Sequence, residues 1–248
     1  MSDKEKDTSS TSGMSTSKAT SPLLSFRAEK VVPGRMDEME KAYKARDFQA
    51  FGRLSMMDSN QFHATCMDTY PPIFYMTDVS KTIIRLCHVI NDYYKSVKAA
   101  YTFDAGPNAV IYCLEADTEM IMAVMARYFP APGKTSDYCS DPVFYDGCNS
   151  KASDLIPAEL LALLEKTGRV PTAGDVKYVF HTRAGPGPIK QPADEMLLDP
   201  ATGMPVAPKP HHKKLEIAPA PSSCCTLHNA MLITVGLVAG LLVNKLRN

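Results

Sequence analysis

The sequence has no excess of either charge, because 27 lysines and arginines are matched by 27 aspartates and glutamates. It also has no block rich in lysine or arginine. A protein that binds nucleic acid through its charge normally shows one or the other, so nucleic acid is not an expected partner. No apolar run lies near the N-terminus, which argues against a secretory signal and favours a reducing compartment.

The seven cysteines contain no Cys-x-x-Cys pair. This spacing excludes a zinc ribbon and a thioredoxin-type redox motif, and in a reducing compartment the thiols are expected to be free. No internal repeat is present, so a solenoid or propeller is not indicated. The overall composition, 45% hydrophobic and 22% charged, is that of a globular chain with one or two domains.

Four segments differ in composition. Residues 1–21 end in a run with ten serines and threonines among positions 8–21, which composition alone predicts to be flexible. Residues 22–185 have regular hydrophobic periodicity and are expected to form the folded domain. Residues 186–221 hold nine of the 19 prolines and are predicted to be a linker, and residues 222–248 form a tail with an uncharged, mostly apolar run at 230–243.

Helical and strand patterns alternate within the folded segment. Asp47 and Asp78 are placed to cap helices, and Asp104–Asn108 separates two short runs rich in β-branched and aromatic residues. This order predicts an α+β fold, with helices packed on one face of a mostly antiparallel sheet. The predicted helices begin at Pro33, run from Asp47 towards Thr69, begin at Asp78, and span Asp117–Tyr128 and Pro157–Lys166; the predicted strands are Lys98–Phe103, Ala109–Leu114 and Val176–Thr182.

Asp104 is the strongest candidate for chemistry. It follows a predicted strand and precedes a Gly-Pro turn, so its carboxylate would project from a rigid edge, as a general base requires. The same pattern also fits an aspartate that only caps the next element or forms an Asx-turn, and spacing alone favours that structural role.

Other patterns give weaker signals. Ser9, Ser10 and Thr11 could offer hydroxyls to a phosphate or carboxylate, although Ser/Thr runs are more often unstructured. His63 and Cys66, with Asp58 nearby, are too few to define a metal site and are better explained by core packing. The loop at 185–187 lacks the lysine and hydroxyl residue of a phosphate-binding P-loop, and the polar run at 211–214 lies in the predicted linker.

Longer motifs, in order along the chain, resemble those of the diphosphomevalonate (mevalonate 5-diphosphate) decarboxylases of the GHMP kinase superfamily. The resemblance runs from about Ser2 to about Met204. The motifs are Thr20-Ser-Pro-Leu-Leu24, Val31-Val-Pro33, Met57-Asp-Ser-Asn60, Phe62-His-Ala-Thr-Cys66, Pro71-Pro-Ile-Phe-Tyr75, Ala100-Tyr-Thr-Phe-Asp-Ala-Gly-Pro-Asn-Ala109 and Gly185-Pro-Gly-Pro188.

The resemblance implies an activity. Members of the family use ATP with Mg²⁺ to convert mevalonate 5-diphosphate into isopentenyl diphosphate and CO2, in isoprenoid and sterol synthesis. By this resemblance Asp104 is the base that contacts the tertiary 3-hydroxyl of the substrate. Ser10 and Thr11 fall in the segment whose hydroxyls meet the substrate, so residues 8–14 are expected to form a substrate-facing loop.

The resemblance also implies limits. It covers the C-terminal lobe of the family, with the chain starting near the end of the last strand of the N-terminal lobe, at Ser2–Asp7. The ATP-binding loop belongs to that other lobe, so turnover by these 248 residues alone is not expected. A homodimer and a cytoplasmic location are expected from the family. The alternative is a non-catalytic binding or membrane-associated module that has kept only this lobe.

The apolar run at 230–243 has two interpretations. As a helix, fourteen residues would span about 21 Å, which is short for a bilayer core of about 30 Å. The small-residue spacing of Gly236 and Gly240 is nevertheless typical of membrane helices, and Cys224 and Cys225 could be acylated. The other interpretation is a terminal helix that docks on a hydrophobic surface of the protein.

Overall fold

The structure is a computed structural model that describes residues 8–185, 188, 196–199, 201–206 and 230–233. Contacts divide the chain into two units. The larger unit contains the described residues up to Arg183 together with 230–233, and the smaller one contains the described residues from Ala184 to Val206. In the smaller unit, Asp199 accepts backbone hydrogen bonds from Ala201 and Thr202 and closes a turn.

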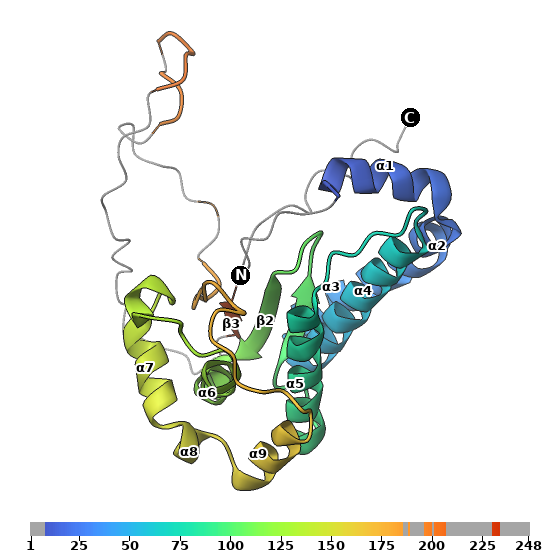
Figure 1. Cartoon of the computed structure of the whole chain (residues 1–248). Helices are drawn as coiled ribbons and strands as arrows, with labels where there is room; N and C mark the ends of the chain where they lie inside the picture. Colours follow the sequence, from blue (N-terminus) through green and yellow to red (C-terminus); the bar gives the residue numbers. More distant parts are fainter. Residues whose placement is uncertain (1–7, 186–187, 189–195, 200, 207–229, 234–248) are drawn as a thin grey trace. The chain divides into compact units, whose positions relative to one another are not determined.

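Antiparallel strands form the centre of the larger unit, in the order β1–β2–β3 (Figure 1). This confirms the α+β class. The elements of this unit are α1 (Ser10–Thr20), α2 (Pro22–Phe26), the π-helical turn η1 (Arg27–Val31), α3 (Val32–Ala45), α4 (Phe48–Asp68), α5 (Asp78–Tyr94), β1 (Ala100–Phe103), β2 (Ala109–Leu114), η2 (Glu115–Asp117), α6 (Thr118–Tyr128), η3 (Thr135–Asp137), α7 (Pro142–Ser150), α8 (Ala152–Leu155), α9 (Ala158–Glu165) and β3 (Ala230–Ile233).

Capping residues set the helix starts as the sequence indicates. The Asp47 carboxylate accepts the amide of Ala50 and begins α4. The N-cap of α5 is Thr77 and not Asp78 as expected, and Thr77 forms a capping box with Ser80. Strand β2 and helix α6 agree with the sequence to within one residue.

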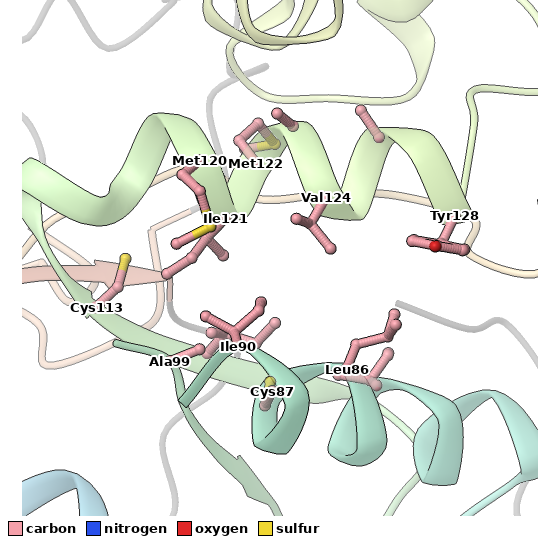
Figure 2. Packing of buried hydrophobic residues seen from close by; sticks show 14 of the residues in the cluster. Leu86, Cys87, Ile90, Ala99, Cys113, Met120, Ile121, Met122, Val124 and Tyr128 are labelled. Carbon is pink, nitrogen blue, oxygen red and sulfur yellow. The ribbon is translucent and has the colours of Figure 1, made fainter. Parts of the chain in front are cut away.

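The main core lies between α5, α6 and the strands. Figure 2 shows Leu86, Cys87 and Ile90 of α5 facing Ile121 and Val124 of α6. All five side chains are fully buried or nearly so. The face of α5 that carries Leu86, Cys87 and Ile90 is therefore turned into the core, towards α6.

Helix α4 covers the edge of β1 that is not paired with β2. The two backbones approach closely at Gly52, where a Cβ atom would lie 2.9 Å from the Cβ of Ala100 and 2.7 Å from Cγ1 of Val97. The Ser59 hydroxyl accepts the backbone N–H of Phe103 at 3.0 Å. The N–H of Phe103, which faces the unpaired edge of β1, thus finds its acceptor on a helix.

The segment 176–182 is not a strand, so that prediction was wrong. Val179 forms an isolated parallel bridge with Cys139, and its N–H donates to the carbonyl of Tyr138 at 2.8 Å. The ring of His181 stacks on Phe144, with centroids 4.1 Å apart. These contacts hold the segment against η3 and α7 instead of in the sheet.

Part of the apolar C-terminal run is described, and it is extended. Ala230–Ile233 forms β3, which pairs with β2 so that Ile233 stands opposite Ile111. A docked terminal helix is therefore wrong for these four residues, and the remainder of 230–243 lies outside the described part of the chain. Among the described residues, no helix has the length and apolar character needed to cross a bilayer.

The close approach of α4 to β1 yields a stability prediction. Gly52→Ala should lower the free energy of unfolding by about 1–3 kcal/mol, because the new methyl group meets the rigid Ala100 Cβ and the helix must move away. Urea denaturation of the full chain measures the change. Gly34→Ala is the matched control: Gly34 lies in α3 with no atom near its Cβ position, so alanine should stabilise by up to about 1 kcal/mol. Equal effects of the two substitutions would contradict the packing argument.

Candidate active site

Asp104 lies on a turn that is fixed at both ends. It directly follows β1, and the N–H of Gly106 donates to its backbone carbonyl at 2.7 Å. The hydroxyl of Ser80, in the capping box of α5, donates to the carbonyl of Pro107 at 2.9 Å. The turn is therefore held by β1 on one side and by the start of α5 on the other.

The carboxylate of Asp104 is exposed to solvent and has no hydrogen-bond partner among the described residues. Among the described residues it accepts no hydrogen bond, either from its own turn or from a neighbouring element. An Asx-turn or a helix cap would require such a bond, so the structural role that spacing alone favoured is not the one observed here. The side chain is free to contact a ligand.

His63 lies behind the Asp104 turn. This α4 residue is buried, and its ring makes an edge-on contact with Phe103, with centroids 6.2 Å apart. Burial lowers the pKa of His63 below its ordinary value of 6.5, while a hydrogen bond to the backbone of Phe103 and the charge of Asp104 partly oppose that shift. The ring is therefore neutral at pH 7, and its Nε2 atom is buried without a hydrogen-bond partner in the described structure.

Cys66, the other candidate metal ligand on α4, is a core residue. It is buried with Ile73 and Tyr75, and burial raises the pKa of its thiol to about 11. Asp58 forms ion pairs with Arg27 and Arg35, at 2.8 and 3.1 Å. Burial would raise the pKa of Asp58, but these two arginines outweigh it and leave the pKa lowered. Core packing and ion pairing thus account for these residues, and the described residues contain no group of three metal-ligating side chains.

Residues 10–20 form a helix, so the expectation of a flexible or loop conformation there was wrong. The Ser9 hydroxyl caps α1 by accepting the N–H of Ser12 at 3.1 Å. Farther along, the hydroxyl groups of Ser17 and Thr69 lie 2.7 Å apart, and Thr20 accepts the N–H of Tyr70. The helix is stabilised by these contacts with the end of α4, which a count of serines and threonines cannot reveal.

The N-terminus of α1 presents Ser10 and Thr11. The first amides of a helix have no intrahelical acceptor, and the helix dipole makes this end electropositive. The first turn of α1 contains no acidic residue. Two hydroxyls and free amides together suit a phosphate or carboxylate group.

One small apolar cluster connects this helix to the Asp104 turn. Cys66, Ile73 and Tyr75 form its buried centre, and Ala105, the residue after Asp104, packs against it. The Tyr75 hydroxyl reaches the carbonyl of Ser9 at 3.5 Å, and α1 lies so close that a Cβ on Gly13 would be 2.5 Å from the Tyr75 oxygen. The cluster therefore places Ser10 and Thr11 in the same region of the molecule as Asp104.

The comparisons with known proteins identify the family of this chain. The family model of the mevalonate 5-diphosphate decarboxylase C-terminal domain matches residues 1–191. The chain belongs to this family. Diphosphomevalonate decarboxylases that it resembles include those of Danio rerio, 44% identical over 81% of this chain and 48% of the relative, and of Homo sapiens, 48% identical over 74% of this chain and 44% of the relative.

Solved structures support the same assignment. A crystal structure of a mevalonate 5-diphosphate decarboxylase is 46% identical, with a TM-score of 0.54, covering 61% of this chain and 39% of that one. The Trypanosoma brucei mevalonate diphosphate decarboxylase is 31% identical, with a TM-score of 0.60, covering 71% of this chain and 45% of that one. The chain thus spans about half the length of the relatives it matches.

Among the described residues, no group of three or more His, Cys, Asp or Glu side chains could hold a metal ion. Gly185 is exposed, and its neighbours in the candidate loop, 186 and 187, lie outside the described residues. Ser59, His63 and Tyr75 are contacts that the sequence did not single out as part of the site. Ser59 and His63 could have been found from α4, whose buried residues Ser59, His63 and Cys66 recur at helical spacing.

The proximity of Asp104 and His63 can be tested by titration. Because the negative charge of Asp104 favours the protonated imidazole, Asp104→Asn should lower the pKa of His63 further below 6.5. NMR titration of the histidine ring protons between pH 4.5 and 8, with resonances assigned through His63→Gln, measures the shift. Asp154→Asn, which removes an exposed carboxylate on α8, should leave the His63 pKa unchanged. A shift of the same size in both variants would argue against the arrangement.

Proposed function

We propose that this chain provides the catalytic base and substrate-binding half of a diphosphomevalonate decarboxylase. The reaction is the ATP-dependent conversion of mevalonate 5-diphosphate into isopentenyl diphosphate, CO2, ADP and phosphate. The family match, together with relatives that are 41–48% identical, supports this reaction class. The observation that carries the proposal is the uncommitted Asp104 carboxylate on its fixed turn.

The chemistry assigned to Asp104 is removal of a proton. A tertiary alcohol is a poor nucleophile until a positioned base takes its proton, and a carboxylate at the end of a strand can do this. The oxygen can then receive a phosphoryl group from ATP, after which phosphate leaves as the C–C bond to the carboxylate breaks and CO2 departs. In this proposal His63 supports the Asp104 turn from behind. Because its ring is neutral, it does not form an ion pair with the Asp104 carboxylate.

The N-terminus of α1 provides the second part of the proposal. Ser10 and Thr11 would donate hydrogen bonds to an anionic group of the substrate, in a region that the helix dipole makes electropositive. Homodimer formation and a cytoplasmic location are proposed with this function on the family resemblance alone. ATP and Mg²⁺ are expected to bind through the half of the relatives that this chain does not match.

A chimera tests the role of Asp104. The C-terminal half of the Saccharomyces cerevisiae relative, 43% identical over 83% of this chain, is replaced by residues 1–206 of this chain. ATP-dependent release of CO2 from carboxyl-labelled mevalonate 5-diphosphate should be restored, and Asp104→Asn should reduce kcat by about a hundredfold to ten-thousandfold without changing the melting temperature. Asp154→Asn is the control and should keep full activity. A stable chimera whose Asp104→Asn variant turns over normally would contradict the assignment.

Substrate binding by α1 is tested in the same chimera. Replacing Ser10 with Ala and Thr11 with Val should raise the KM for mevalonate 5-diphosphate by about tenfold or more, since hydrogen bonds to charged groups contribute about 1.5–3 kcal/mol each. The KM for ATP should change little. The Ser9 cap is retained, so far-UV circular dichroism should remain the same. An effect confined to kcat, or to the KM for ATP, would contradict a substrate-binding role.

A further inference from the structure

An apolar cavity of about 200 Å³ lies beside β2 and is separate from the Asp104 carboxylate. Its walls include parts of β2, α5, α6 and the segment 175–180, with Ile83, Ile111, Ile121, Met125 and Val179 among the lining residues. Most of this segment belongs to Val176–Thr182, which the sequence predicted to be a strand. Because η3 and α7 hold it away from β2, a space remains between it and the sheet.

The polar side chains in the cavity wall already have partners. The Tyr138 hydroxyl donates to the carbonyl of Phe129 at 2.7 Å, and Asp175 pairs with Arg169. The Thr77 hydroxyl is hydrogen-bonded to the Ser80 hydroxyl, and the Tyr145 hydroxyl is hydrogen-bonded to the backbone of Ala131. An occupant therefore finds no free polar group among these side chains and must itself be apolar.

The register of β3 leads towards this cavity. Antiparallel pairing places Ile233 opposite Ile111, and β3 runs from Leu114 towards the start of β2. Two further residues of pairing would bring position 235 opposite Ala109, and both Ala109 and Ile111 line the cavity. The next ten residues of the sequence, 234–243, are Thr-Val-Gly-Leu-Val-Ala-Gly-Leu-Leu-Val, without a charge.

We propose that the segment 234–243 of this chain is the occupant, with one or two of its apolar side chains filling the cavity. Strand β3 continues along β2 past Ile233, and the apolar side chains that follow enter the space between β2, α6 and the segment 175–180. The wall includes Pro107 and Ala109, which follow Asp104 by three and five positions. The docked segment thus supports the far end of the Asp104 turn, and its apolar surface is covered by the protein itself instead of by lipid.

Disulfide trapping in the full chain tests the continued pairing. Ala109→Cys is combined with Val235→Cys in one variant and with Thr234→Cys in a matched control, both in a Cys224→Ser, Cys225→Ser background. Diamide takes the two hydrogens as the two thiols join. The 109–235 pair should form at least about tenfold more intrachain disulfide than the 109–234 pair, because only directly opposite residues have the required geometry and a one-residue shift faces the other side. Mass spectrometry of unreduced peptides measures both products.

Met231→Cys provides an internal reference, since residue 231 stands opposite the native Cys113. The expected result is that the 113–231 and 109–235 pairs both form within one chain. Formation of 113–231 without 109–235 would overturn the proposal, because pairing would then stop at Ile233. Failure of both pairs would also overturn it, and so would 109–235 disulfides that join two chains, which would assign the segment to a second copy.

Vesicles distinguish the protein cavity from a membrane. The full chain is incubated with vesicles of phosphatidylcholine and phosphatidylserine, centrifuged, and then oxidised. The chain should stay in the supernatant, and the yield of the 109–235 disulfide should be unchanged. Sedimentation with the vesicles together with at least about a tenfold loss of that disulfide would assign residues 234–243 to lipid and overturn the docking proposal.

Discussion

The contact between α4 and the free edge of β1 is the constraint on which the rest of the structure depends. It requires glycine at position 52, and it is completed by hydrogen bonds from Phe103 to Ser59 and from the Tyr101 hydroxyl to Asn60. These bonds fix the position of the end of β1, and therefore the position of Asp104, which follows it directly. The same helix supplies the side chain of His63 behind the turn, and its far end supports α1. One helix thus sets the positions of both parts of the proposed site.

The two parts of the site are connected by packing and not by a direct polar contact between them in the described structure. Tyr75 and Ile73 lie between the N-terminus of α1 and the Asp104 turn, and Ala105 packs on the same cluster. An apolar spacer leaves the hydroxyls of α1 and the carboxylate of Asp104 free, whereas a hydrogen bond between them would commit both. This separation suits a substrate with an anionic group at one end and a hydroxyl at the other.

Local patterns predicted those elements whose stability is local. The cap at Asp47 and the β-branched and aromatic run of β2 gave boundaries within one or two residues, since each depends on neighbours in sequence. Helix α1 and the segment 176–182 were predicted wrongly because their partners are distant. Helix α1 depends on Thr69 and Tyr75, and in the segment 176–182 the backbone of Val179 bonds to Tyr138 and Ser140. A strand-like composition shows that a segment can pair, but not with which partner.

In the candidate site, too, the sequence predicted local features but not those that depend on distant residues. Spacing identified Asp104 as the residue at the end of a strand but favoured a capping role, and only the resemblance suggested a base. The structure removes the basis for the capping role, because the described residues donate no hydrogen bond to that carboxylate. A cap consumes the lone pairs that catalysis needs, so the two roles compete for the same atoms. What decides between them is the Ser80–Pro107 bond, which holds the turn from the backbone and leaves the Asp104 side chain unused.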